Sequence, residues 1–233
     1  MILSGDTIRN MIVKDGLVET DSMTLEGVLA SVGPNSLDVH LGQRFMRILP
    51  PKDGVIDLRK KQEYETTILE NENEQFILPA NGFALATTTE VLNLPADMCA
   101  LVDGRSTTGR LGLVVETAGM INAGFVGTIT LELKNVENYP IILRAGDSVA
   151  QIRFEQLDRP TSRAYRGVYQ NQRSTTEPFI SNEAASVGQA SIVSGKPVKE
   201  SGKGVLEKDR AEEDVFWKPC AGKDVTPRHE LFW

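Results

Sequence analysis

From about Phe76 onward, hydrophobic and polar positions fall into short runs that are rich in Val, Ile, Leu and Thr. Turn residues at 79–82, 94–97 and 144–147 separate these runs at short intervals, which is typical of strands in an all-β sandwich or barrel. The runs that predict strands are 83–89, 98–102, 128–133, 141–143 and 148–154. The pattern therefore predicts a mainly β fold with few helices.

The first residues of the chain predict a short helix. Ser4 is a good N-cap, Ile8, Met11 and Ile12 share one helical face, and Gly16 is a typical terminator. By contrast, residues 51–75 are polar and charged with little periodicity, and we expect an excursion there with one strand near 54–58.

After Phe179 the composition shifts to Ser, Gly, Lys and Glu, which predicts a linker or disordered segment. We therefore expect one domain over residues 1–180 and a C-terminal extension over 181–233. The extension contains the apolar clusters 215–217 and 231–233, which could dock on the domain or on an unknown partner, although free termini are often mobile.

Length and charge narrow the function classes. The chain has 233 residues, 40% of them hydrophobic, which suits one ordinary domain plus an extension. Its net charge of -7 argues against a broad surface for nucleic acid or anionic membrane, but a pocket with a few local cations could still bind a small anion. No apolar run approaches the ~20 residues that span a bilayer and no signal peptide is evident, so we expect a cytoplasmic protein.

The cysteines and histidines are few and far apart. Cys99 and Cys220 lie in unlike surroundings, which makes a disulfide framework improbable. Neither these cysteines nor His40 and His229 form a Cys-x-x-Cys or His-x-Glu spacing, so we expect no zinc site.

Residues 103–112 have the composition of a phosphate-binding loop. Two arginines, three hydroxyl side chains and three glycines occur within ten residues. Glycines admit close backbone approach, hydroxyls and amides donate hydrogen bonds, and guanidinium groups neutralise phosphate charge. A surface turn with ordinary charges explains the same composition, so this segment alone decides nothing.

The strand expected at 128–133 carries a second candidate. Strand alternation places Ile129, Leu131 and Leu133 on one face and Thr128, Thr130 and Glu132 on the other. Taken alone, this pattern favours a Glu132 that simply faces water.

The two segments together resemble a known family. Residues 104–113 resemble the phosphate-binding motif of dCTP deaminases and dUTPases, and residues 117–133 resemble the base and sugar pocket of that family. Residues 140–152 are similar to its next strand pair, while 1–4 and 34–42 resemble the deaminase branch in particular. The resemblance covers residues 1 to about 175 in the right order, which chance similarity explains poorly.

Two features favour a deaminase over a plain dUTPase. The dUTPase pattern has an apolar residue where Glu132 stands, and it closes its site with a glycine-rich C-terminal segment. Residues 169–173 are instead similar to the deaminase lid.

The resemblance implies a distorted, dUTPase-like β-barrel that forms a homotrimer with active sites shared between subunits. It assigns Glu132 as the proton shuttle of a metal-independent deamination, with Ser106, Arg110 and the backbone carbonyl of Ala118 holding the water. Zinc-dependent nucleobase deaminases use a His and Cys ligand set that this chain lacks.

The resemblance also assigns the nucleotide contacts, with Mg²⁺ carried by the triphosphate and not by protein side chains. The residues expected to bind phosphates, sugar or base are Arg105, Ser106, Thr107, Thr108, Gly109, Arg110, Asn122, Thr130, Leu131, Gln151, Tyr165 and Gln172. Of these, Gln151 and Tyr165 have simpler structural explanations in backbone satisfaction and ordinary packing.

Two positions depart from the family pattern. Asn122 stands where the family usually has aspartate, and an amide accepts a hydrogen bond from the sugar but cannot act as a base. Val168 stands where many members have a lysine, a contact that Arg163, Arg166 or Arg173 would have to replace.

The leading hypothesis is therefore an enzyme that converts dCTP to dUTP and ammonia. One alternative is a bifunctional enzyme that continues to dUMP and pyrophosphate, which residues 117–119 and 129–133 favour and Asn122 opposes. A second alternative is a non-catalytic regulator that senses nucleotides and binds another protein through its extension.

Overall fold

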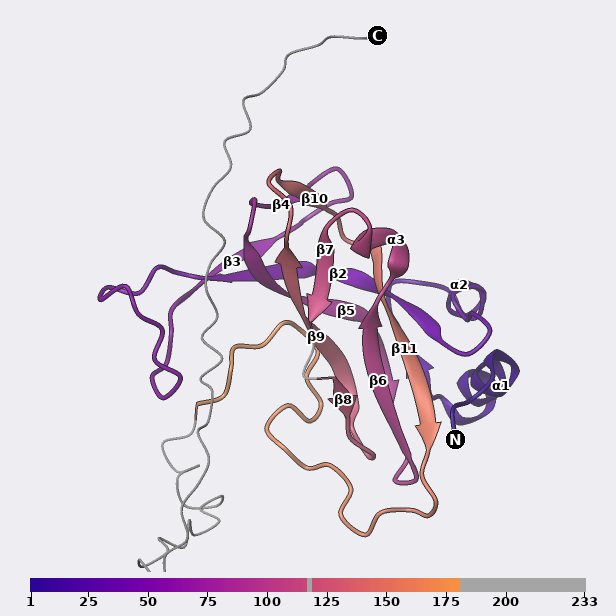
Figure 1. Ribbon diagram of the computed structural model, residues 1–233. Helices are drawn as coiled ribbons and strands as arrows, with labels where there is room; N and C mark the ends of the chain where they lie inside the picture. The colour runs from indigo at the N-terminus through magenta and orange to yellow at the C-terminus, as the bar shows by residue number, and fades with distance from the viewer. Residues whose placement is uncertain (117–118, 181–233) are drawn as a thin grey trace, which may run out of the picture. The chain divides into compact units, whose positions relative to one another are not determined.

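A computed structural model describes residues 1–116 and 119–180, which form a mainly β domain around a nine-stranded sheet (Figure 1). The main path of the sheet runs β7-β9-β5-β2-β11-β6-β8, with β1 added beside β5 and β3 beside β2. These strands are β1 (Val18–Glu19), β2 (Leu37–Ile48), β3 (Tyr64–Ile68), β5 (Phe83–Asn93), β6 (Met98–Gly104), β7 (Leu113–Glu116), β8 (Met120–Ile121), β9 (Val126–Asn135) and β11 (Ser148–Gln156). A separate ribbon pairs β4 (Phe76–Leu78) with β10 (Ile141–Leu143).

The helices are few, as the hydrophobic pattern predicts. The first, α1 (Gly5–Asp15), begins where the Ser4 hydroxyl accepts from the Thr7 amide and ends at Gly16 with φ 63°, so both expected ends are confirmed. The others are α2 (Leu25–Ala30) and the single turn α3 (Ser106–Gly109), which follows β6.

Strand β2 makes the sheet curl. Its first residues pair with β11, whereas Leu41 and the residues from Arg44 onward pair with β5 and β3. At the change of partner, a Cβ on Gly42 would lie only 2.8 Å from the Thr87 methyl group, so the strands approach too closely for another residue. This corner gives the domain the curved, barrel-like sheet that the family resemblance implies.

The core fills the inside of the curved sheet. The Phe45 and Phe76 rings stack with their centroids 4.5 Å apart, joining β2 to the β4–β10 ribbon. Leu131 and Phe154 are fully buried in the same cluster, which ties β9 and β11 to one core. Burial of these side chains is the main stabilising contribution to the domain.

One expected strand is misplaced. Residues 54–58 are irregular, and Val55, Ile56 and Leu58 are exposed. The strand of this excursion is instead β3, because Tyr64–Ile68 finds an unpaired edge of β2. The availability of a pairing partner in β2, and not the apolar composition of 54–58, therefore determines which residues of this excursion form a strand.

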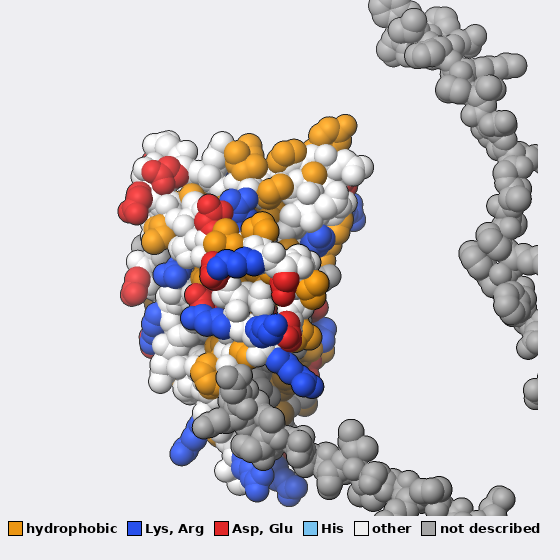
Figure 2. Space-filling model, turned by 90° about the vertical axis from the view of Figure 1, so that its left-hand side faces the viewer, with side chains coloured by type: hydrophobic (Ala, Val, Ile, Leu, Met, Phe, Trp, Pro, Cys, Tyr) orange, Lys and Arg blue, Asp and Glu red, His pale blue; other side chains and the backbone are white. Residues whose placement is uncertain are grey.

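The surface of the described domain mixes charges of both signs. Figure 2 shows Lys, Arg, Asp and Glu side chains interspersed over one face, with hydrophobic side chains gathered at its upper end. The β4–β10 ribbon leaves Ile77 and Ile142 exposed opposite each other. Within residues 1–116 and 119–180, no helix is long and apolar enough to cross a membrane. The expected extension over 181–233 lies outside the described residues.

Candidate active site

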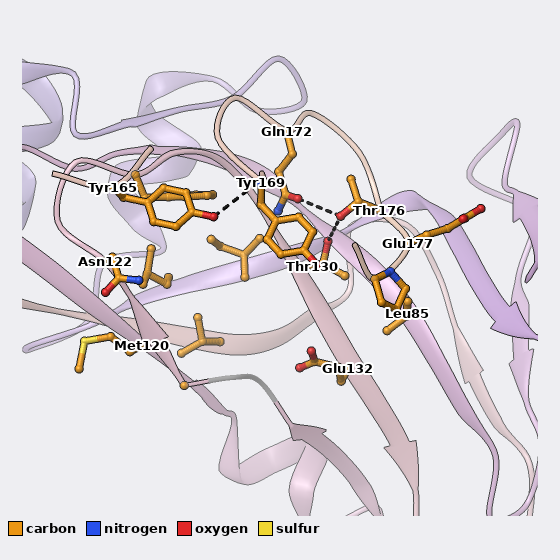
Figure 3. A pocket seen from close by; sticks show the side chains of 16 residues that line it. Leu85, Met120, Asn122, Thr130, Glu132, Tyr165, Tyr169, Gln172, Thr176 and Glu177 are labelled. Carbon is orange, nitrogen blue, oxygen red and sulfur yellow. Dashed lines mark hydrogen bonds between the residues drawn. The ribbon is translucent and has the colours of Figure 1, made fainter. Parts of the chain in front are cut away.

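The described residues enclose a pocket of about 380 Å³ beside strand β9 (Figure 3). One wall comes from β9 and β5, a second from β8 and the turn after it, and a third from the segment 165–178. Its lining residues are Leu85, Val102, Gly119, Met120, Ile121, Asn122, Phe125, Ile129, Thr130, Glu132, Tyr165, Tyr169, Gln172, Thr176, Glu177 and Pro178.

Strand β9 positions Glu132 and Thr130 through simple alternation. Leu131 and Leu133 are fully buried in the core, so Thr130 and Glu132 lie on the opposite, half-buried face that borders the pocket. The expectation that the pattern alone favoured, a Glu132 facing open water, is wrong because segment 165–178 covers this face. The Leu131 side chain belongs to the core and not to the pocket. Any contact between Leu131 and a nucleotide would therefore have to come from its backbone.

The segment after β11 builds the outer wall. Gln172 forms a bridge with Gly127, and its backbone carbonyl accepts from the Thr128 amide at 3.0 Å. Tyr165 donates its backbone amide to Ala123, and its ring lies 5.7 Å from that of Phe125. Tyr165 and Gln172 therefore both line the pocket, and their nucleotide contacts stay a prediction.

The pocket is acidic. Among its described lining residues the charged side chains are Glu132 and Glu177, and neither lysine nor arginine is present. Glu177 pairs at its exposed edge with Lys61 at 3.2 Å. Burial raises the pKa of the nearby Tyr64 phenol above its ordinary value, and the Glu177 carboxylate adds to the effect. The described pocket alone is thus poorly suited to a triphosphate.

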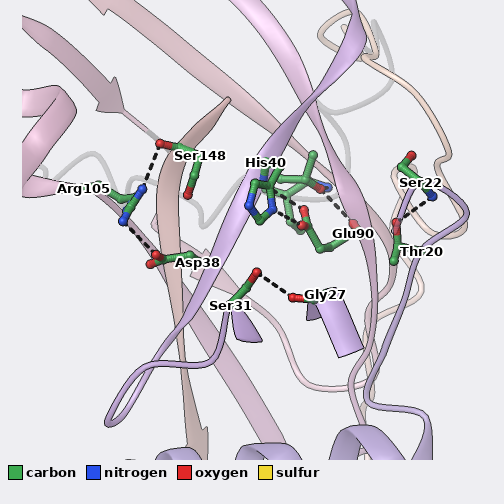
Figure 4. Close-up of polar contacts among 11 residues, drawn as sticks. Thr20, Ser22, Gly27, Ser31, Asp38, His40, Glu90, Arg105 and Ser148 are labelled. Atoms are coloured by element: carbon green, nitrogen blue, oxygen red, sulfur yellow. Dashed lines mark hydrogen bonds and ion pairs between the residues drawn. The ribbon is translucent and has the colours of Figure 1, made fainter. Parts of the chain in front are cut away.

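The expected phosphate-binding residues lie elsewhere, around α3. Ser106, Thr107, Gly109 and Arg110 are exposed and do not line the pocket. Arg105 is held by the Asp38 carboxylate at 2.9 Å and by the backbone carbonyl of Ser148 at 3.3 Å (Figure 4).

Thr108 fastens this turn to β11, because its hydroxyl lies 3.0 Å from the Arg105 carbonyl and 3.3 Å from the Val149 carbonyl. The segment 105–110 is therefore an ordered, cationic turn, as a phosphate-binding loop requires.

One further expected residue, Gln151, does not line the described pocket. Gln151 lies on β11 beside Asp38 and Asp103, and its side-chain oxygen accepts from the Ser36 hydroxyl at 3.3 Å. This partner is a side-chain hydroxyl and not the backbone group of the simpler explanation, and the expected nucleotide contact of Gln151 stays a prediction. Ala118 and Thr117 lie outside the described residues.

Several pocket residues were not predicted. Thr176, Glu177 and Pro178 reach the pocket without any expectation, whereas Met120 and Tyr169 were expected only as parts of the runs 117–133 and 169–173. No periodicity marks residues 174–178, because their position depends on where the chain crosses β9. The lid-like run was the one available signal that this segment closes a site.

A buried polar pair lies outside the pocket. The Glu90 carboxylate is fully buried on β5 and contacts the His40 ring nitrogen Nδ1 at 2.6 Å and the His40 backbone amide at 3.0 Å (Figure 4). These contacts join β2 to β5 at the curl of the sheet. Across residues 1–116 and 119–180, no three His, Cys, Asp or Glu side chains gather in a group that could hold a metal ion.

Known proteins resemble this chain over most of its length. Residues 2–157 match the family model described as dCTP deaminase-like. A protein of Sulfurihydrogenibium sp. (strain YO3AOP1) named "dCTP deaminase, dUMP-forming" is 40% identical over 181 residues, which cover 77% of this chain and 97% of that protein. A protein of Aquifex aeolicus (strain VF5) with the same name is 43% identical, covering 74% of this chain and 91% of that protein.

A solved structure agrees with the sequence matches. The 2'-deoxycytidine 5'-triphosphate deaminase from Agrobacterium tumefaciens superposes with a TM-score of 0.51 and 27% identity. The superposition covers 66% of this chain and 47% of that one, so it spans about half the length of that protein. With a family model matching more than half of its residues and relatives of 40% and 43% identity, the chain belongs to the dCTP deaminase-like family.

Proposed function

We propose that this protein removes the amino group from the cytosine of dCTP and then cleaves the triphosphate, giving ammonia, dUMP and pyrophosphate. The observation that carries the first step is Glu132, a carboxylate on the half-buried face of β9 inside a mostly apolar pocket. The second step departs from the leading sequence hypothesis, which ended at dUTP. The relatives named dUMP-forming support the bifunctional alternative instead.

The pocket suits a nucleoside. Phe125, Ile129 and Tyr165 supply apolar walls for a planar ring, while Thr130 and Gln172 supply hydroxyl and amide groups for its polar edge. A cavity of about 380 Å³ is in the range of small-molecule sites. Asn122 lies at the opposite end, where its amide can accept a hydrogen bond from a sugar hydroxyl.

The deamination step uses Glu132 as acid and base. The carboxylate takes a proton from water while the water oxygen bonds to C4 of the cytosine ring, and it passes that proton to N3. It then takes the proton of the new C4 hydroxyl and gives it to the departing amine. The carbon–nitrogen bond then breaks, ammonia leaves, and a carbonyl forms at C4. Ser106, Arg110 and the Ala118 carbonyl are proposed to hold the water, on the family resemblance.

The triphosphate requires a second subunit in this proposal. The described pocket has two carboxylates and no cationic side chain, whereas Arg110 is exposed on a separate turn that also carries Arg105, which is paired with Asp38. A homotrimer that brings this turn to the pocket of a neighbouring copy would supply the missing positive charge. Mg²⁺, which prefers oxygen ligands, would be held by the phosphate oxygens of the nucleotide itself.

A specific observation favours a second candidate, in which dUTP is the final product. Asn122 lines the pocket, and its amide cannot accept a proton from water at neutral pH. If the attack on phosphorus needs a carboxylate at this position, the reaction stops after deamination.

The test is product analysis after incubation with dCTP and Mg²⁺, with ammonia, dUTP, dUMP and pyrophosphate resolved over time. We expect ammonia, dUMP and pyrophosphate in equal amounts. Accumulation of dUTP with little pyrophosphate would establish the second candidate. Tight binding of dCTP with no ammonia at all would reject catalysis and leave a nucleotide-sensing regulator.

A further inference from the structure

We infer that Thr176 is a positioning residue that fixes the side-chain amide of Gln172, and through it the hydrogen-bond polarity of the pocket. The inference rests on the proposed function, because it concerns how the same pocket recognises its nucleotide. Neither the phosphate-binding motif nor the expected base and sugar contacts include Thr176, yet its side chain lines the pocket between Gln172 and Thr130 (Figure 3).

The orientation of the Gln172 amide follows from donor and acceptor chemistry. Its Nε2 group lies 2.6 Å from the backbone carbonyl of Thr128, which can only accept. The amide nitrogen must therefore face Thr128, and the amide oxygen Oε1 must face Thr176. The Thr176 hydroxyl donates to Oε1 at 3.0 Å, which completes the pair of contacts.

The same chemistry assigns a direction to the next contact. Because the single hydroxyl proton of Thr176 goes to Gln172, the contact of 3.5 Å between the hydroxyls of Thr176 and Thr130 has Thr130 as the donor. Hydrogen bonds then run from Thr130 to Thr176, to Gln172 and to the Thr128 carbonyl. Thr130 keeps its acceptor lone pairs and Gln172 keeps one N–H for a ligand.

Thr176 is not what holds this segment in place. The adjacent Thr175 is buried, with 4% of its surface exposed, and its hydroxyl donates to the Arg44 carbonyl on β2 at 2.7 Å. The Gln172 backbone is joined to β9 independently through Thr128. Loss of the Thr176 hydroxyl should therefore release the Gln172 amide without detaching the segment.

Three substitutions separate positioning from anchoring. Thr176→Val keeps the volume and removes the hydroxyl, Thr176→Ser restores the hydroxyl, and Thr175→Val removes the neighbouring anchor. We expect Thr176→Val to raise both KM and Kd for dCTP about tenfold, the value of one well-placed hydrogen bond, with kcat within about twofold and Tm unchanged. Thr176→Ser should stay within about twofold of the unaltered protein in both constants.

Thr175→Val should behave differently, lowering Tm while raising KM and Kd less than Thr176→Val does. Three outcomes would each overturn the inference. The first is a Thr176→Val variant whose KM and Kd for dCTP are unchanged, and the second is a Thr176→Ser variant that does not restore these constants. The third is a Thr175→Val variant that raises them as much as Thr176→Val does. Calorimetric Kd values for dCTP test the role of Thr176 separately from the proposed reaction. If the unaltered protein binds dCTP without turnover, the proposed reaction is wrong, but the ratio of Kd values between the variants still tests whether Thr176 positions Gln172. If the unaltered protein binds no dCTP, both proposals are wrong.

Discussion

At the scale of single residues, the pocket contains two carboxylates in different surroundings. Glu132 is half-buried on β9, whereas Glu177 is exposed and paired with Lys61. An enclosed carboxylate is shielded from bulk water and can pass protons repeatedly to one bound ring. The two residues therefore offer a matched pair for testing which carboxylate reacts.

Replacement of Glu132 by Gln should abolish ammonia release while dCTP binding persists. The amide keeps the shape of the side chain but cannot shuttle protons, so we expect a loss of at least about 10²–10⁴-fold in kcat. Ammonia assays and calorimetry measure the two effects, and Glu177→Gln is the control that should retain most activity. Near-normal turnover by Glu132→Gln would contradict the proposed role of Glu132 as the proton shuttle.

Asn122 tests the second step. If this position only contacts the sugar, Asn122→Asp should leave the ratio of pyrophosphate to ammonia near that of the unaltered protein, because the water is activated by other groups. Product ratios in the presence of Mg²⁺ provide the measurement. A large rise in pyrophosphate with no change in ammonia would mean that phosphorus attack lacks its base, which favours dUTP as the natural product.

At the scale of the elements, the position of β9 depends on an irregularity in its neighbour β5. Pairing between the two strands shifts register between Thr87 and Val91. Inside this shift, the buried hydroxyl of Thr88 accepts from the Ile129 amide at 3.0 Å and donates to the Glu90 carbonyl at 2.8 Å. One side chain thus replaces the backbone bonds that the irregular register loses.

Thr88→Val should therefore destabilise the domain. It leaves a buried N–H and a buried carbonyl without their partner, and we expect a loss of about 1–3 kcal/mol in the free energy of unfolding. Urea denaturation measures this change. Thr89→Val is the matched control, because the Thr89 hydroxyl is buried with no hydrogen-bond partner in the described part of the chain, so its removal should cost little. Equal losses of unfolding free energy in Thr88→Val and Thr89→Val would contradict a stabilising role for the hydrogen bonds of the Thr88 hydroxyl.

At the scale of the whole molecule, the turn proposed to bind phosphate and the described pocket complement each other in charge and shape. Residues 105–110 supply cations without a cavity, and the described pocket supplies a cavity without cations. In our proposal, a closed cyclic arrangement, the usual form of homo-oligomers, would join each turn to a neighbouring pocket. A trimer remains our prediction for the number of copies.

Mixing inactive subunits tests this arrangement. Arg110→Ala and Glu132→Gln subunits, refolded together, should recover part of the ammonia-forming activity, because some mixed sites combine an unaltered Arg110 with an unaltered Glu132. Light scattering should give the mass of a trimer throughout. Two variants altered at the same position, Glu132→Gln and Glu132→Ala, are the control that cannot recover. A monomeric, fully active protein would contradict the shared site.

The sequence by itself determined the features that local chemistry controls. Ser4 and Gly16 set the ends of α1 through a cap and a left-handed turn, and alternation in 128–133 separated Leu131 from Glu132. The composition of 103–112 marked a cationic turn. Each of these depends on neighbours a few residues away, which a sequence displays directly.

Only the tertiary structure decided what depends on long-range pairing. It placed a strand at Tyr64–Ile68 instead of 54–58, because β2 offered a partner there. It laid residues 172–178 across β9, which turned a strand face into a pocket and brought in Thr176. It also kept Arg110 out of that pocket. Contacts between residues distant in sequence are set by packing and hydrogen bonding of the complete sheet, and no periodicity in the chain encodes them.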